Sequence, residues 1–352
     1  MATPPRPPAD EPAVLLAVDA GGTSTRALVA DADGRRLGHA LAGTGNPRAV
    51  GVERALQAVA GAAESALAAA GVPGARVRVA VAAVAGSEGT LEPADLARAL
   101  GPLGVRQARF LRVSDLVAAF RSGTLEPAGA ALVAGTGSVA ARVEDSRLVR
   151  VVGGSGWLLG DAGSGFWTGR RVARAAVAAL DGTGPPTALV GALLAELGLD
   201  GDVPAVGGRP GVLVHVLDRL HGDDPLRLAR LAPLAFRAAP ADPLAADLVR
   251  SVHDALASLV VSVAGPGPLV AGGSLWRHGV AGSPVPLSPR LAQALEGVPV
   301  RSADDGLLGA AVLAVQALGL GESAVAAAAQ RLREQLQDLP APRPLRAGGA
   351  AR

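Results

Sequence analysis

The chain contains no lysine, cysteine or tyrosine, and only 2% of its residues are aromatic. Without cysteine there can be no disulfide, thiolate zinc site, cysteine nucleophile or cysteine-ligated iron–sulfur cluster. Without lysine there is no Gly-x-x-x-x-Gly-Lys loop and no catalytic strand lysine, which excludes a P-loop NTPase and a protein kinase. The formal net charge is only +2, and the arginines are scattered without aromatic neighbours, so no nucleic-acid partner is expected.

Long apolar runs are equally scarce. Residues 255–276 carry no charge, but the segment Gly265-Pro-Gly-Pro268 interrupts them, which predicts a helix end and a new strand rather than a membrane span. Residues 1–12 hold five prolines and no apolar run, unlike a signal peptide. We therefore expect a cytoplasmic protein with no membrane partner and with disordered tails at 1–12 and 339–352.

The stretch from Val14 to Arg26 stands out among what is present. Its apolar run reads as a buried strand that ends near Asp19, and Gly21, Gly22 and Thr23 then form a turn whose N–H and hydroxyl groups suit a phosphate. Residues 130–142 repeat this plan around the turn Gly135-Thr136-Gly137-Ser138. One such turn is weak evidence in a chain with 47 glycines, but the pair predicts two hairpins that grip a polyphosphate.

The remaining pattern predicts an α/β fold in two domains. A chain of 352 residues exceeds the size of about 250–300 residues at which a single core stops growing. We place the boundary in the Gly- and Pro-containing link 122–129, which gives domains at 13–121 and 122–338. Strands are expected at 77–84 and 110–113, and a strand and turn at 269–276. Helices are expected at 52–70, 116–121, 166–180, 188–197, 211–220, 226–238, 243–263, 305–318 and 322–336.

Taken in order, the motifs resemble a known family. They are Asp19-x-Gly-Gly-Thr23, Asn46-Pro47, Ser114-Asp115, Gly135-Thr-Gly-Ser138, the glycine-rich run 153–164 and Gly272-Gly-Ser-x-Trp276. This order is similar to that of the N-acetylglucosamine kinase branch of the BadF/BadG/BcrA/BcrD-type ATPase family, in the actin-like ATPase superfamily, over roughly residues 13–320. The resemblance implies two ribonuclease H-like α/β domains with a ligand cleft between them.

The resemblance also implies roles for individual residues. Asp115 would be the catalytic base and a sugar contact, and Asp19 would lie beside Mg²⁺. The implied nucleotide contacts are Asp19, Gly21, Gly22, Thr23, Gly135, Thr136, Gly137, Gly272, Gly273 and Ser274. The implied sugar contacts are Asn46, Gly86, Asp115, Gly154 and Asp161. Animal members of the branch have Ser-Gly-Gly where this chain has Ala85-Gly86-Ser87.

The function implied in this way is ATP- and Mg²⁺-dependent phosphorylation of an amino sugar, with N-acetylglucosamine at its 6-hydroxyl as the first candidate. Glucosamine and N-acetylmuramic acid are alternative substrates, and a non-catalytic, nucleotide-gated binding protein is the alternative from another class. The oligomeric state stays open, a homodimer included. Local structure could also explain the motif residues, because Asp19 can end a strand, Asp115 can cap a helix and Asn46 before proline can form a turn.

Overall fold

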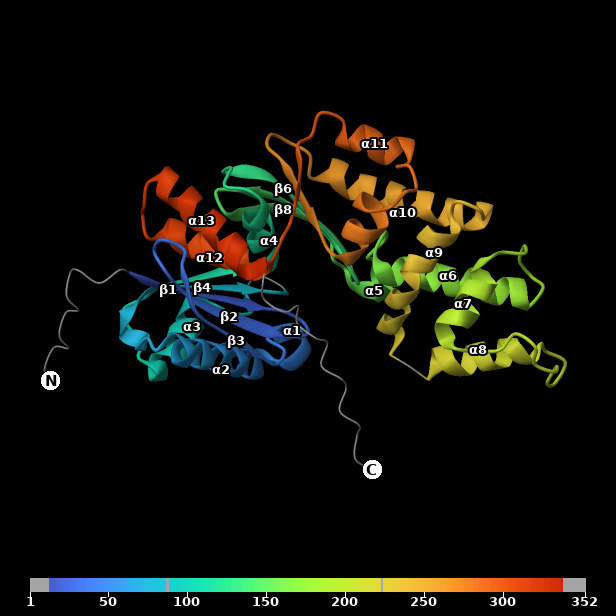
Figure 1. Ribbon diagram of the computed structural model, residues 1–352, viewed down its shortest axis with the longest axis horizontal. Helices are drawn as coiled ribbons and strands as arrows, with labels where there is room; N and C mark the ends of the chain where they lie inside the picture. The colour runs from blue at the N-terminus through green and yellow to red at the C-terminus, as the bar shows by residue number, and fades with distance from the viewer. Residues whose placement is uncertain (1–12, 87–88, 223, 338–352) are drawn as a thin grey trace, which may run out of the picture. The chain divides into compact units, whose positions relative to one another are not determined.

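The computed structural model describes residues 13–86, 89–222 and 224–337, so the predicted disordered tails lie outside the described residues. The chain divides into two compact units (Figure 1). Unit 1 comprises Met1–Leu125 together with Asp304–Arg352, and unit 2 comprises Glu126–Ala303.

Unit 1 contains a five-stranded sheet in the order β3-β2-β1-β4-β5. Its strands are β1 (Val14–Ala20), β2 (Thr25–Asp31), β3 (Arg36–Ala42), β4 (Val77–Val84) and β5 (Arg109–Ser114). The first three form an antiparallel meander, whereas β4 and β5 run parallel to β1. The carboxyl ends of β1 and β5 therefore meet at one edge of the sheet, where β1 carries Asp19 and β5 runs into Asp115.

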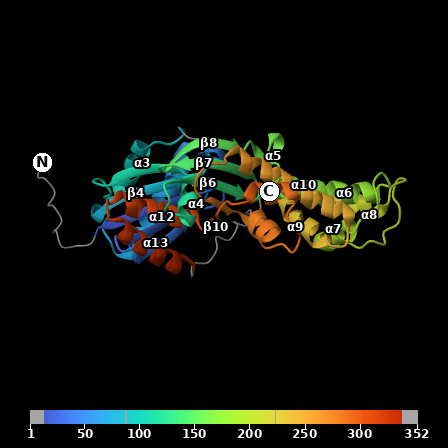
Figure 2. The ribbon, with the colours of Figure 1, turned by 90° about the horizontal axis from the view of Figure 1, so that it is seen from above.

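Helices cover both faces of this sheet (Figures 1 and 2). α2 (Val52–Ala70) and α3 (Pro93–Leu100) lie on one face, and α4 (Asp115–Gly123), α12 (Gly306–Ala317) and α13 (Glu322–Gln337) lie on the other. The expected end of α2 at Gly71 is confirmed, since this glycine adopts the left-handed conformation (φ 63°) that closes a helix. Short elements complete the unit, namely α1 (Pro47–Val50) and the 3₁₀ turns Gly74–Arg76 and Gly101–Leu103.

The chain does not divide where the sequence suggested. The expected second domain at 122–338 loses its last two helices to unit 1, and unit 1 ends at Leu125 rather than at residue 121. The physical reason lies in α12, which is buried on nearly every side and needs partners on two faces. It packs on β1 and β4 and also on α4, where a Cβ at Gly309 would lie 1.8 Å from the carbonyl oxygen of Ala118.

Unit 2 repeats the sheet topology of unit 1, in the order β10-β9-β6-β7-β8. Its strands are β6 (Ala128–Ala134), β7 (Ser138–Glu144), β8 (Arg147–Gly153), β9 (Leu269–Gly272) and β10 (Val300–Ser302). Again three antiparallel strands are followed by two that run parallel to the first. The predicted repeat of the hairpin is confirmed, and so is the α/β class with two domains of the same kind.

The helices predicted in unit 2 are confirmed with one exception, and three short helical segments, Gly156–Leu159, Trp276–Ala281 and Pro289–Leu295, were not predicted. They are α5 (Gly156–Leu159), α6 (Gly165–Leu180), α7 (Leu189–Leu197), α8 (Gly211–His221), α9 (Ala232–Ala238), α10 (Pro243–Ser262), the π-helical segment Trp276–Ala281 and α11 (Pro289–Leu295). The helix expected at 226–238 is instead a 3₁₀ segment, Pro225–Leu231, followed by α9. Pro233 lies in the first turn of α9 and has no N–H to continue a preceding helix.

The charge-free stretch 255–276 is not one helix. α10 ends at Ser262, and β9 starts at Leu269, as the Gly-Pro-Gly-Pro segment predicted. Within the described parts of the chain, no helix combines the length and the apolar character that crossing a bilayer requires.

Candidate active site

The first predicted phosphate turn joins β1 to β2. The turn closes through the N–H of Gly21, which donates to the carbonyl of Ser24 at 3.0 Å, and the N–H of Gly45 donates to the carbonyl of Gly21 at 3.1 Å. Gly22 and Thr23 at its tip are exposed. A phosphate could therefore approach their N–H groups and the hydroxyl of Thr23.

Asp19 lies in a charged cluster that the sequence analysis did not identify. Arg26, its partner in the β1/β2 register, donates from Nη2 to Asp19 Oδ2 at 2.5 Å. The same guanidinium binds both oxygens of Asp305, at 2.5 and 2.6 Å. Burial raises the pKa of Asp19, Arg26 opposes this shift, and the Asp305 charge adds to it. One guanidinium thus balances two carboxylates, which leaves a net negative charge.

Asp115 is the first residue of α4. Ser114 is the N-cap, and its hydroxyl accepts from the N–H of Leu116 at 3.3 Å. Asp115 Oδ1 accepts from the same N–H at 2.9 Å and from the hydroxyl of Ser114 at 3.2 Å. Burial raises the pKa of Asp115, the Ser114 bond opposes the shift and Asp19 adds to it. Ser114 and Asp115 thus both accept from the N–H of Leu116, and Asp115 is a half-buried carboxylate whose pKa is raised.

Asn46 and Gly86 lie side by side in unit 1. Asn46 Oδ1 accepts from the N–H of Arg48 at 2.9 Å, so Asn46 caps α1 and has a local structural role. Gly86 has a φ of 112°, and a Cβ there would lie 3.2 Å from Asn46 Oδ1. The structure thus brings together two expected sugar contacts that are 40 positions apart in the sequence.

The two predicted phosphate turns of unit 2, Gly135–Gly137 and Gly272–Ser274, are neighbours because β6 and β9 pair in parallel. Gly273 has a φ of 92°, and a Cβ there would lie 2.2 Å from the carbonyl oxygen of Ala134, so only glycine allows this approach. The first turn is fastened to the start of α6, where the N–H of Gly165 donates to the carbonyl of Gly135 at 2.7 Å.

Asp161 lies against the first of these turns. A Cβ at Gly137 would lie 2.8 Å from Asp161 Oδ2. Asp161 has a φ of 55°, unusual for a residue with a side chain. Burial raises its pKa, and the N–H groups of Ser138 and Gly156 oppose the shift. Its Oδ1 is buried without a hydrogen-bond partner in the described structure, so this carboxylate could receive a donor from a ligand.

Gly154, the other sugar contact expected in unit 2, is close to the same turn. Its N–H donates to the carbonyl of Ser138 at 2.8 Å, and its φ is 66°. Gly154 and Asp161 therefore both border the start of β7. The glycine-rich run 153–164 folds so that its two ends meet the strand that follows the phosphate turn.

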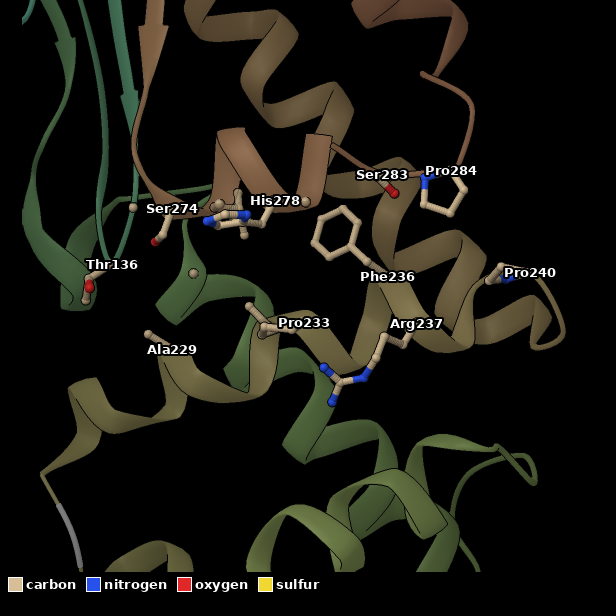
Figure 3. Close-up of a pocket in the computed structure, with 15 residues that line it drawn as sticks. Thr136, Ala229, Pro233, Phe236, Arg237, Pro240, Ser274, His278, Ser283 and Pro284 are labelled. Carbon is tan, nitrogen blue, oxygen red and sulfur yellow. The ribbon is translucent and has the colours of Figure 1, made fainter. Parts of the chain in front are cut away.

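A pocket of about 400 Å³ opens beside the two turns of unit 2 (Figure 3). Thr136 and Ser274 lie at one end of it, and Pro240 and Pro284 lie at the other. The ring of Phe236 and the imidazole of His278 line the middle. The pocket thus combines an apolar chamber with N–H-bearing turns at one end. A nucleobase and its phosphate chain require such an arrangement.

The chamber was missed in the sequence because its walls come from separate elements. Phe236 and Arg237 belong to α9, and His278 belongs to the π-helical segment. No spacing marks them, although a π-helical turn is itself often associated with function. Trp276, the last residue of the Gly-Gly-Ser-x-Trp motif, is buried and does not line the pocket.

The donor set at Asp19 is compatible with Mg²⁺. The described residues hold no group of three or more histidine, aspartate or glutamate side chains of the kind that cages a metal ion. Mg²⁺ in nucleotide sites commonly uses one or two carboxylates, and phosphates and waters supply the rest. Asp19 supplies such an oxygen, since its Oδ1 makes no hydrogen bond within the described residues.

Solved structures and a protein family are similar to this chain. A protein from Chromobacterium violaceum, provisionally assigned as an N-acetylglucosamine kinase, is 26% identical with a TM-score of 0.61, over 86% of this chain and 98% of that one. A Porphyromonas gingivalis protein with the same provisional assignment is 20% identical with a TM-score of 0.60, over 87% and 100% of the two chains, and supports the fold. No curated protein matches. A sequence model matches residues 16–314, and the chain belongs to the BadF/BadG/BcrA/BcrD ATPase family.

Proposed function

We propose that this protein is an ATP-dependent kinase of an amino sugar, and that it phosphorylates N-acetylglucosamine at the 6-hydroxyl. The observation that carries the proposal is the pocket of unit 2, with its apolar chamber and two glycine-rich turns at one end. Membership of an ATPase family implies the use of ATP. The similarity to the Chromobacterium protein along most of both chains supports the sugar as acceptor.

In this proposal the chamber of unit 2 holds the nucleoside. Its volume of about 400 Å³ lies in the range of small-molecule sites. Phe236 and Pro233 offer apolar surface to the base, whereas the turn at Gly135–Gly137 offers backbone N–H groups to phosphate oxygens. Such donors replace the lysine that many nucleotide sites use and that this chain lacks.

The reaction needs a base and fixed geometry more than covalent chemistry. Asp115 accepts the proton of the sugar hydroxyl while that oxygen forms its bond to the γ-phosphorus. The bond from the γ-phosphorus to the β–γ bridging oxygen breaks, and ADP leaves. Mg²⁺, when bound near Asp19, supplies positive charge to the phosphates. The raised pKa of Asp115, caused mainly by burial, makes it a better base than an exposed aspartate.

In this proposal each unit offers polar groups to the sugar. Asn46 and Gly86 form one pair, and Asp161 carries a buried oxygen without a partner. Removing a buried group that bonds a substrate hydroxyl leaves the hydroxyl unsatisfied, at a cost of about 1–3 kcal/mol. We expect N46A and D161A to weaken sugar binding about 5- to 150-fold and ATP binding far less, as measured by calorimetry.

D145A is the matched control, because Asp145 is an exposed aspartate that also has a positive φ (47°). It should leave both affinities unchanged. Equal losses of sugar and ATP affinity in N46A or D161A would contradict their assignment to the sugar.

A panel of sugars with ATP tests the function itself. N-acetylglucosamine should stimulate ADP release more than glucosamine, N-acetylmuramic acid and glucose, and mass spectrometry should find the 6-phosphate. Stimulation by one of the other amino sugars would change the substrate but keep the kinase. ADP release that no sugar stimulates would refute the kinase and favour a nucleotide-gated binding protein.

A further inference from the structure

The arginine in the Asp19 cluster has no part in the reaction as proposed so far. Arg26 is 17% exposed in its side chain and comes from β2, directly opposite Asp19. It joins Asp19 to Asp305, which lies 279 positions after Arg26 in the chain. Asp305 is the N-cap of α12, and its Oδ1 accepts from the N–H of Leu307 at 2.8 Å. Arg26 is thus anchored to the start of a buried helix.

Because of this anchoring, the two carboxylate oxygens of Asp19 differ in their hydrogen bonds. Oδ2 is bound to Arg26, whereas Oδ1 makes no hydrogen bond to any described residue. The start of α12 also packs against this carboxylate, because a Cβ at Gly306 would lie 3.0 Å from Oδ1 and from Cγ and 3.1 Å from Oδ2. The absence of a side chain at position 306 therefore keeps room for the carboxylate of Asp19.

We infer that Arg26 and Asp305 are positioning residues for the divalent cation that accompanies the nucleotide. Asp305 holds the guanidinium through both of its oxygens, and the guanidinium holds one oxygen of Asp19, so that the other oxygen is presented to the cation or to one of its waters. The inference rests on the proposed function, because it assumes that a nucleotide and its metal bind at Asp19.

Two physical arguments support this role. Carboxylates that bind metals are themselves oriented by hydrogen bonds, and loss of such a partner typically costs about 10- to 100-fold in metal affinity. The cluster also keeps a net negative charge, since two carboxylates share one guanidinium. Arg26 can therefore fix Asp19 without cancelling the attraction for a cation. A neutral side chain in place of Arg26 would leave the carboxylate of Asp19 free to rotate.

The test is the Mg²⁺ dependence of ADP binding, measured by calorimetry in Mg²⁺ and in EDTA. The dissociation constant in EDTA divided by that in Mg²⁺ reports the contribution of the metal. This ratio is insensitive to a general loss of folded protein. We expect the ratio to fall about tenfold or more in R26Q and in D305N. R26K should be intermediate, because an ammonium cannot make the two-pronged contact with Asp305.

Two control variants remove similar groups outside the cluster. Arg35 is exposed, and its side chain makes no hydrogen bond or ion pair within the described residues; Asp304 pairs with Arg333 at 2.8 Å. R35Q and D304N should leave the ratio unchanged. An unchanged ratio in R26Q and D305N, with only a lower melting temperature, would show that the cluster merely ties β2 to α12 and would overturn the inference. A higher ratio would do so too, because Arg26 would then compete with the metal.

A metal titration without nucleotide separates this inference from the proposed function. Binding of Mn²⁺ alone, followed by electron paramagnetic resonance, should be about tenfold weaker in R26Q than in the wild type. Failure of the wild type to bind ADP would refute the proposed function, while the Mn²⁺ titration still decides the role of Arg26. Equal or tighter Mn²⁺ binding in R26Q would overturn the inference.

Discussion

Asp115 offers the sharpest test of the reaction, through the substitution D115N. Asparagine keeps the size of the side chain and an oxygen that can accept from the N–H of Leu116 and from the hydroxyl of Ser114. It removes only the basicity. Loss of a general base typically costs about 10²- to 10⁴-fold, which corresponds to about 3–5.5 kcal/mol of transition-state stabilisation. We therefore expect kcat to fall by that factor while ATP affinity hardly changes.

The same substitution should not destabilise the protein. Burial raises the pKa of Asp115, so the folded state disfavours the charged form relative to the unfolded chain. For an acid with a raised pKa, the folded state binds more protons, and the charge is a cost to stability at neutral pH. Removing the charge should leave the melting temperature at pH 7 equal to or above that of the wild type.

S114A is the matched control for helix capping. It removes the N-cap hydroxyl that accepts from the N–H of Leu116 and should cost about 1 kcal/mol in stability. It should reduce kcat much less than D115N. The wild-type kcat/KM should decrease as the pH falls through the raised pKa of Asp115, above the usual aspartate range. If D115N keeps more than about a tenth of the wild-type kcat, Asp115 is not the base.

Three further predictions concern the pocket and the core. A229F should fill the part of the pocket beside Gly165. Calorimetry should then show ADP binding weakened at least about tenfold, or 1.4 kcal/mol, whereas an unchanged affinity would place the nucleotide elsewhere. Burial lowers the pKa of His253, whose Nδ1 accepts from the N–H of Ser288. The free energy of unfolding should therefore decrease as the pH falls below about 6.5. In urea titrations, H253Q should reduce this dependence on pH. G309A should destabilise the folded protein by about 1–3 kcal/mol, because the added methyl group would overlap Ala118. G61A in α2, where the space around the glycine is open, should instead stabilise it by about 0.5–1 kcal/mol.

The strands and phosphate turns could be predicted because their information is local. A buried strand such as β1 needs a continuous apolar run, and the turn that follows needs glycine. Both features are present again at β6 and β7, so the sequence predicted the duplication of the hairpin. The ends of α2 and the division of the charge-free stretch 255–276 were equally local, because Gly71 and Pro268 act on their own neighbours.

The packing partners could not be predicted in this way. α12 reads as an apolar helix in any domain, and only its contacts with β1 and α4 assign it to unit 1. The pocket has the same difficulty, since Phe236 and His278 meet only after α9 and the π-helical segment have packed. Asp305 was expected within a helix and not near Asp19, because nothing in the sequence connects positions that are hundreds of residues apart.

The absence of lysine acquires a physical meaning from the charges of unit 1. Asp19 and Asp305 share Arg26, and the charge of Arg112 lowers the pKa of Asp115. Two carboxylates thus share one guanidinium group in the Asp19 cluster. Arg26 already gives hydrogen bonds from both terminal nitrogens to carboxylates, so it cannot turn to a phosphate without abandoning them. A polyphosphate near these carboxylates would be repelled unless a cation came with it. In the proposed reaction, the cluster would therefore favour a nucleotide that arrives as its metal complex, and the turn N–H groups, which carry no full charge, would set its position.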